Sequence, residues 1–250
     1  MPLCELHYRS NALEKQTAAS ILLPSADVPG PYNVMFLLHG LSDDNTAWTR
    51  YTSIERYVSG LPLIVVMPDG GRGFYCDAEE GFAYGTAIGI ELPELIRGYF
   101  PTKPAWCATG LSMGGYGAAK LALTHPELFV SAHSHSGAVG FGHHVEYLDS
   151  DRGAEFRRIL GELPKGGKND LYALAKSLPR ISHPKLRIDC GVEDFLIEDN
   201  RAFTAHLSAI GFEHEYEEFP GAHTWDYWDR HVVDAIDFHC KNLGILKVGP

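Results

Sequence analysis

A serine between two glycines marks the stretch of the chain best suited to chemistry. Gly110, Ser112 and Gly114 form a G-x-S-x-G pattern, which follows an apolar, strand-like run at 105–108 and precedes small residues typical of a helix. On a tight strand-to-helix turn the serine hydroxyl projects from the sheet edge, and the flanking glycines avoid a Cβ clash. The helix directs its positive end at the same point. The pattern predicts a nucleophilic Ser112; a glycine-rich loop that happens to contain a serine is the alternative.

A serine hydroxyl needs an adjacent base, and the base needs an acid that fixes its tautomer and stabilises its positive charge. His223 is the best candidate base, because it lies in a loop between a predicted strand and the last predicted helix. Asp194 follows the preceding strand, which ends near Cys190, and is the candidate acid. The order serine, acid, histidine is that of the α/β-hydrolase arrangement.

Other polar residues compete less well for these roles. Glu193 should point away from its neighbour Asp194, and Glu198 and Asp199 are typical of charges at a helix N-terminus. The remaining histidines singled out lie in a predicted strand, in a loop pair or on helices: His133, His135, His143, His144, His206, His231 and His239. No H-E-x-x-H or comparable ligand spacing occurs, so we expect no metal site.

A tetrahedral intermediate needs two donors for its oxyanion. We assign one to the backbone N–H of Met113, directly after the nucleophile, and the other to the N–H of Leu41. Leu41 lies in the turn His39-Gly-Leu-Ser42 that follows the first buried strand, although this could also be an ordinary strand-end turn. Three aromatic residues, Tyr75, Phe195 and Trp225, follow strand ends or the base, and each could line the site or belong to the core.

The hydrophobic pattern predicts strands that alternate with helices. Expected strands are 4–10, 17–23, 33–38, 61–67, 105–108, 129–135, 186–190 and 213–219, and expected helices are 52–59, 87–99, 115–123, 155–160, 170–178, 200–210 and 225–240. This alternation indicates an α/β fold: a mainly parallel central sheet with helices on both faces and an N-terminal antiparallel hairpin. We expect a single domain, 1–250, with a small cap-like insertion around 138–180.

Composition narrows the class of protein further. The formal charge of −11 over 250 residues argues against a nucleic-acid partner. Neither a membrane-spanning run nor a signal peptide is apparent, so we expect no membrane partner and a cytoplasmic location. The cysteines are five in number, scattered and without C-x-x-C spacing, which indicates neither a disulfide framework nor a zinc site: Cys4, Cys76, Cys107, Cys190 and Cys240.

Five motifs occur in order: His39-Gly-Leu-Ser, Val66-Met-Pro-Asp, Gly110-Leu-Ser-Met-Gly-Gly-Tyr-Gly, Cys190-Gly-Val-Glu-Asp-Phe and Gly221-Ala-His-Thr-Trp. Taken together, they resemble the esterase D-like carboxylesterases of the α/β-hydrolase superfamily, and most of all the bacterial tributyrin esterases with their feruloyl- and cinnamoyl-ester hydrolysing members. The resemblance implies an α/β-hydrolase fold, a triad of Ser112, His223 and Asp194, a small-molecule ester substrate and no cofactor. It also suggests a homo-oligomer.

Related families leave alternatives open. S-formylglutathione hydrolases and mycolyltransferases are similar, but the sequence after His223 is Thr-Trp-Asp-Tyr-Trp, where the glutathione thioester enzymes would carry Ser-Tyr-Tyr-Phe-like residues. We expect a serine carboxylesterase acting on short acyl chains, with aryl acyl groups such as cinnamoyl as further candidates. A thioesterase or acyltransferase is the alternative, and a non-catalytic binding protein of the same fold is the weakest.

Overall fold

The computed structural model describes residues 1–245. Its described part contains one eight-stranded sheet in the order β1-β2-β4-β3-β5-β6-β7-β8. The strands are β1 Leu3–Ser10, β2 Lys15–Leu22, β3 Tyr32–Leu38, β4 Leu63–Pro68, β5 Thr102–Leu111, β6 Phe129–His135, β7 Lys185–Gly191 and β8 His214–Phe219. The hairpin β1–β2 is antiparallel and joins β4 antiparallel, whereas all later pairs are parallel. The predicted α/β architecture with its N-terminal hairpin is confirmed.

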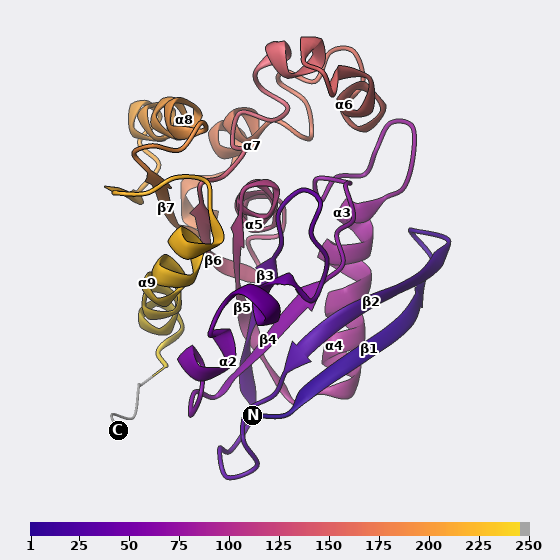
Figure 1. The fold of residues 1–250 in the computed structure, drawn as a ribbon, viewed down its shortest axis with the longest axis vertical. Coiled ribbons are helices and arrows are strands. Elements are labelled where there is room, and N and C mark those ends of the chain that lie inside the picture. The colour runs from indigo at the N-terminus through magenta and orange to yellow at the C-terminus, as the bar shows by residue number, and fades with distance from the viewer. Residues whose placement is uncertain (246–250) are drawn as a thin grey trace.

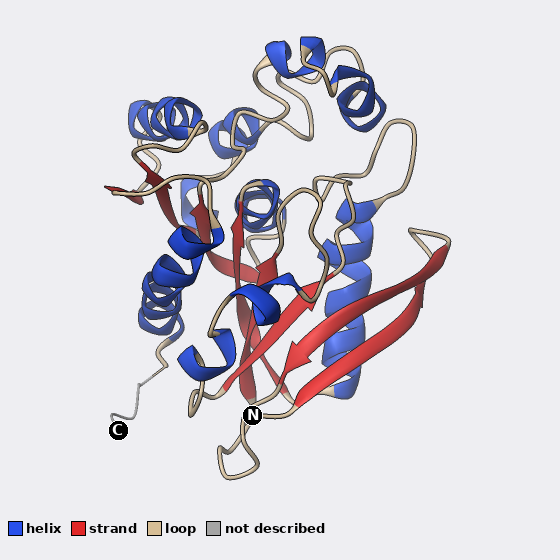
Figure 2. Ribbon diagram, in the orientation of Figure 1, coloured by secondary structure: helices blue, strands red, loops and turns tan. Residues whose placement is uncertain are grey.

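Helices cover both faces of this sheet (Figures 1 and 2). They are α1 Ala47–Tyr51, α2 Ile54–Tyr57, α3 Tyr84–Thr86, the π-helical turn η1 Ala87–Glu91, α4 Leu92–Tyr99, α5 Met113–Thr124, α6 Gly153–Leu160, α7 Leu171–Ser177, α8 Ile197–Ala209 and α9 Trp225–Leu243, with 3₁₀ turns η2 Val145–Asp149 and η3 Arg180–Ser182. One core layer joins the sheet to α1, α2 and α9. The other joins it to α4, α5, α7 and α8.

The central strands are buried on both faces, which explains their continuous apolar sequences. All six residues of β4 are buried, as are six of the seven in β3. Since the strands from β3 onward are parallel, their carboxyl ends meet at one edge of the sheet, where ligands bind in open α/β folds. The loops after β3, β5, β7 and β8 therefore decide what chemistry is available.

Several helical boundaries differ from the expectation, α1 was not predicted, and two of the differences have a clear physical reason. The helix before β5 begins at Tyr84 and contains η1, a wide turn that ends two residues before Pro93; proline has no N–H to donate to the preceding turn. Helix α8 begins at Ile197 and not near residue 200, so Glu198 and Asp199 lie in its first turn. Negative charge is favourable at that end of a helix.

The predicted insertion around 138–180 folds as η2, α6 and α7, beside the loop after β4 (Figure 1). An aromatic cluster ties it down. The Phe74 ring stacks on Phe141 at 3.8 Å between centroids, and Phe156 packs edge-on against both rings. A bidentate ion pair between Arg72 and Glu155, at 2.6 and 2.7 Å, also joins the loop after β4 to α6 at the surface. The last five residues of the predicted 1–250 domain lie outside the described part.

Candidate active site

Ser112 occupies the sharp turn between β5 and α5. Its backbone has φ 55° and ψ −117°, a conformation that residues with a side chain rarely adopt. The turn presses Gly110 against Gly114 so tightly that a Cβ on Gly110 would lie 2.3 Å from the Gly114 carbonyl oxygen. A Cβ on Gly114 would lie 2.3 Å from the carbonyl oxygen of Leu38. The two glycines therefore permit both the turn and the close packing of α5 against β3.

Three side chains from separate loops meet at this turn. The Oγ of Ser112 lies 3.0 Å from Nε2 of His223, and Nδ1 of His223 lies 2.8 Å from Oδ2 of Asp194. Asp194 is only 2% exposed and also accepts the Leu196 N–H at 2.8 Å. Because a carboxylate accepts hydrogen bonds, Nδ1 carries the proton and Nε2 is free to accept the serine proton. This arrangement can activate the hydroxyl for nucleophilic attack.

Two backbone N–H groups are placed for a developing negative charge. Met113 begins α5, and Leu41 follows Gly40, whose Cα lies so near the nucleophile that a Cβ there would be 3.7 Å from the Ser112 Cβ. Among residues 1–245 neither the Leu41 nor the Met113 N–H has an acceptor. Both groups are therefore available to an oxyanion, together with the positive end of α5.

The His39 side chain holds in place the turn 39–42, which carries the Leu41 N–H. The Gly70 N–H donates to its Nε2 at 2.8 Å, so its Nδ1 carries the proton and donates to the Gly40 carbonyl, also at 2.8 Å. Burial lowers the pKa of His39, which keeps the ring neutral in this role. Tyr75 donates its hydroxyl to the His39 carbonyl at 2.9 Å and is only 1% exposed. Tyr75 thus lies beneath the loop and presents no open surface to a substrate.

The other two aromatic candidates lie closer to the surface of the site. Phe195 is 77% exposed, and its ring centroid lies 4.5 Å from that of His223. Trp225 is half-buried and stacks on Tyr51 at 4.9 Å, while Trp228 packs edge-on against His223. Tyr51 was not singled out from the sequence, because nothing in a short helix end indicates which distant residue will stack on it.

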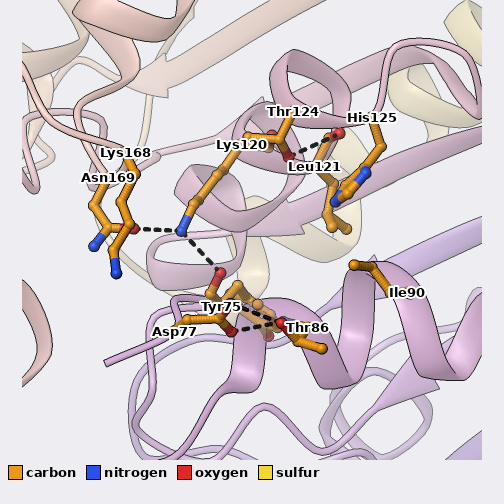
Figure 3. A pocket seen from close by; sticks show the side chains of 11 residues that line it. Tyr75, Asp77, Thr86, Ile90, Lys120, Leu121, Thr124, His125, Lys168 and Asn169 are labelled. Atoms are coloured by element: carbon orange, nitrogen blue, oxygen red, sulfur yellow. Dashed lines mark hydrogen bonds between the residues drawn. The ribbon is translucent and has the colours of Figure 1, made fainter. Parts of the chain in front are cut away.

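Two hollows elsewhere are lined by none of Ser112, Asp194 and His223. A cavity of about 390 Å³ lies between α6 and the loop around Phe82. Another, of about 200 Å³, surrounds Lys120 (Figure 3). The Lys120 ammonium is buried and donates to the Asn169 side chain, the Tyr75 carbonyl and the Cys76 sulfur, at 2.6, 3.3 and 3.2 Å. All three of its donors are used inside the protein, so we assign it a structural role.

One polar cluster was missed by sequence reasoning. His133, His135 and Asp189 are fully buried, and both histidines donate a hydrogen bond to the Asp189 carboxylate. The two histidines were placed in a strand, where the i, i+2 spacing puts both on one face. Asp189 as their common partner depends on the pairing of β6 with β7, which the sequence does not reveal.

Within residues 1–245, the structure contains no helix that is both long and apolar enough to span a membrane.

Comparison with known proteins identifies the family to which the chain is similar. Residues 10–239 match the Esterase family, described as "Putative esterase". The acetyl esterase of Caldicellulosiruptor saccharolyticus is 31% identical over 264 residues, which cover 96% of this chain and 99% of that protein.

Solved structures agree with this match. FphF, a fluorophosphonate-binding serine hydrolase of Staphylococcus aureus, is 31% identical with a TM-score of 0.85, covering 95% of this chain and 97% of its own. The S-formylglutathione hydrolase FrmB of Staphylococcus aureus is 32% identical with a TM-score of 0.82, covering 95% and 98%. The chain therefore belongs to the Esterase family and is an esterase D-like α/β-hydrolase.

Proposed function

We propose that this protein is a serine carboxylesterase that hydrolyses short-chain acyl esters through an acyl-enzyme intermediate. The observation that carries the proposal is the continuous hydrogen-bonded series from Ser112 through His223 to Asp194, with two backbone N–H groups beside it. A binding protein of the same fold would need none of these groups. Their joint presence therefore favours catalysis over binding alone.

The geometry supports a two-step reaction. His223 takes the Ser112 proton as Oγ attacks the ester carbonyl carbon, and the N–H groups of Leu41 and Met113 stabilise the resulting oxyanion. The intermediate collapses, the C–O bond to the alcohol breaks, and His223 returns the proton to the leaving oxygen. Water then attacks the acyl-enzyme with the same base and releases the acid. Asp194 holds the tautomer and stabilises the transient imidazolium.

The surroundings of the serine favour small acyl groups presented as monomers. The insertion 138–180 is held against the loop after β4 by the Phe74–Phe141 stack, so it is not built as a mobile apolar lid. Phe195 and the Trp225–Tyr51 pair offer aromatic surface near His223, which suits an aryl acyl group such as cinnamoyl. We therefore propose acyl chains of about two to four carbons, with aryl acyl esters as a second group.

A thioesterase is the second candidate function. The similarity to an S-formylglutathione hydrolase covers nearly the whole of both chains, and a formyl group is the smallest acyl group. The same serine chemistry would cleave a thioester, since only the leaving atom changes. The acetyl esterase relative favours an oxygen ester in the first place.

Two further expectations remain proposals. The cytoplasm fits because all five cysteines are free in the structure, as is usual in a reducing compartment. The homo-oligomer that the family resemblance suggests would be tested by light scattering on the purified protein.

One substrate panel separates the functions. It measures kcat/KM for p-nitrophenyl esters of increasing acyl length, for a cinnamate ester and for S-formylglutathione, with Ser112→Ala as the blank. A maximum at two to four carbons supports the esterase, and a much larger value for S-formylglutathione supports the thioesterase. A rate that jumps when tributyrin exceeds its solubility would identify a lipase instead, and no turnover of any member would refute the proposal.

A further inference from the structure

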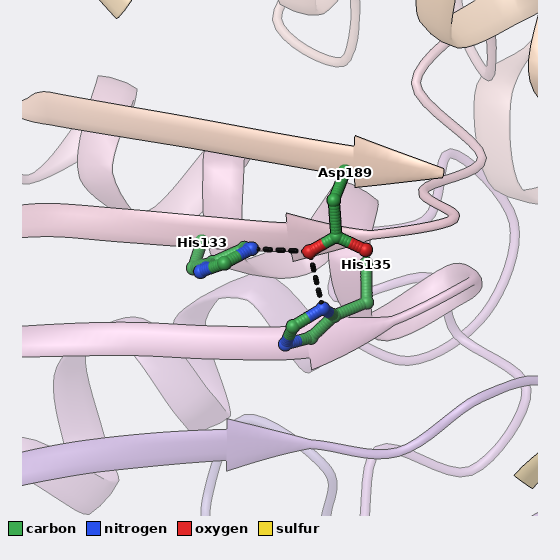
Figure 4. A group of neighbouring side chains, drawn as sticks. All are labelled: His133, His135 and Asp189. Carbon is green, nitrogen blue, oxygen red and sulfur yellow. Dashed lines mark hydrogen bonds and ion pairs between the residues drawn. The ribbon is translucent and has the colours of Figure 1, made fainter. Parts of the chain in front are cut away.

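A buried carboxylate lies under the strand ends that carry the site. Asp189, in β7, is fully buried, and its Oδ2 accepts hydrogen bonds from His133 Nε2 at 2.5 Å and His135 Nδ1 at 2.7 Å (Figure 4). Its other oxygen, Oδ1, accepts the hydroxyl of Tyr227, in α9, at 2.7 Å. One carboxylate thus joins β6, β7 and α9. Within residues 1–245 no other buried carboxylate contacts three elements in this way.

Each of these elements contacts or adjoins the loop that carries one residue of the proposed triad. The Ser112 N–H donates to the carbonyl of His135 at 2.9 Å, so the nucleophile's turn rests on the end of β6. Asp194 lies five residues beyond Asp189, in the loop that β7 leads into. Tyr227 lies four residues after His223, and its ring packs against Gly221, two residues before that histidine. The three contacts of Asp189 therefore fix the supports of Ser112, Asp194 and His223 relative to one another.

The charge of the cluster suits this task. Burial alone would raise the pKa of Asp189, but the adjacent His135 and the hydrogen bonds from both histidines hold it well below its usual range. Burial, together with the adjacent His135, lowers the pKa of His133 to about 4. A buried carboxylate is tolerated only when strong donors satisfy it, so loss of one donor here should be felt by the groups around it.

The distances from the Asp189 oxygens to His133, His135 and Tyr227 are those of hydrogen bonds and not of ligands around a metal ion. A metal ion held at about 2.0–2.2 Å by each of three ligand atoms would push those atoms more than 3 Å apart. The nitrogens of His133 and His135 instead approach Oδ2 of Asp189 at 2.5 and 2.7 Å, and Oδ1 is already occupied by Tyr227. These distances therefore fit a hydrogen-bonded cluster around Asp189 better than a metal-ion site.

We propose that Asp189 is a positioning residue for the hydrolytic reaction, and that its bond to Tyr227 sets the placement of His223 against Ser112. The proposal rests on the proposed function. It assigns to Asp189 no contact with the substrate. Its effect should fall on the chemical steps, because a small displacement of the base slows proton transfer without changing how the ester binds.

The principal test is Tyr227→Phe, which removes one oxygen and keeps the ring. We expect kcat for p-nitrophenyl acetate to fall about 10- to 100-fold, with KM changed less than about threefold. Asp189→Asn keeps the shape but offers one acceptor oxygen in place of two, so it cannot serve both Tyr227 and the two histidines, and kcat should fall at least as far as in Tyr227→Phe. The matched control is Tyr216→Phe, which removes a hydroxyl bonded to Glu218 at 2.8 Å within β8; it should retain wild-type kcat.

A second readout does not depend on turnover. The proton between His223 and Asp194 should give a downfield NMR resonance, assigned by its loss in Asp194→Asn. This resonance should shift or broaden in Tyr227→Phe and stay unchanged in Tyr216→Phe, even if the wild-type protein were to hydrolyse no ester in the panel. Failure of the proposed function is thereby distinguished from failure of the positioning role proposed for Asp189.

Three results would overturn the proposal. One is a folded Tyr227→Phe protein with wild-type kcat and an unchanged resonance. Another is a kcat loss matched equally by Tyr216→Phe, which would indicate a general effect of destabilisation. The third is a stoichiometric metal ion in the purified protein that Asp189→Asn loses, since the carboxylate would then be a ligand.

Discussion

The Nε2 atom of His223 lies 3.0 Å from the Oγ atom of Ser112, although 111 residues separate them in the chain. Since the serine sits on an elbow and makes few packing contacts through its hydroxyl, Ser112→Ala should fold normally. We expect kcat to fall by several orders of magnitude, as for other nucleophiles that act with a base. Ester turnover and circular dichroism on the same preparation check this. Wild-type turnover by a folded variant would remove the central assignment.

The acid can be tested against its neighbours. Asp194→Asn should abolish most turnover, because an amide cannot stabilise the imidazolium and can hold the wrong tautomer of His223. Glu193→Gln, Glu198→Gln and Asp199→Asn should keep substantial kcat, since none of these carboxylates contacts His223 in the structure. Steady-state rates for the four variants decide the matter. An inactive member of the second group beside an active Asp194→Asn would reassign the acid.

Stability should fall in mild acid. Burial lowers the pKa of His39, His133 and His239, that of His133 to about 4. In the unfolded chain each ring titrates near about 6.5, so below that pH the unfolded state binds more protons than the folded one. The free energy of unfolding should therefore be constant above about pH 7 and fall by a few kcal/mol towards pH 4. Urea unfolding at pH 7.5, 6, 5 and 4 measures it, and stability that rises towards pH 5 would contradict the sign.

Phe195 offers a test of acyl selectivity. It is exposed, so Phe195→Ala should change the free energy of unfolding by less than about 0.5 kcal/mol. If its ring contacts an aryl acyl group, kcat/KM for a cinnamate ester should fall about two- to tenfold while the value for acetate stays the same. Tyr99→Ala, an equally exposed aromatic at the end of α4, is the control. Equal losses for both esters would place Phe195 outside the acyl site.

Apolar runs and glycine-marked strand ends were enough to predict the sheet. The continuous apolar runs at 33–38 and 61–67 correspond to β3 and β4, because a strand that is buried on both faces needs apolar residues on both. Ser112, Asp194 and His223 could be placed because each follows a strand end, and strand ends of a parallel sheet converge. The helix boundaries were harder, since Pro93 is accommodated by a wide turn that no local pattern announces.

What the sequence left open depended on which distant side chains meet. For Tyr75 the sequence left open whether it lines the site or belongs to the core, and the loop after β4 turns it under His39. Asp189 looked like one more residue of an apolar strand, and only the register of β6 against β7 sets it beside His135. Such pairings arise from three-dimensional packing, so a single sequence carries little trace of them.

The strained backbone of Ser112 has a consequence for the history of such proteins. With φ 55° and ψ −117°, this residue holds a conformation that costs of order 1–3 kcal/mol for any residue with a Cβ. Glycine adopts it without strain, because it is the mirror image of an ordinary extended conformation. A descendant that no longer had to turn over a substrate would gain stability by exchanging its nucleophile for glycine. The proposed nucleophile is thus a residue that selection for stability alone would tend to replace.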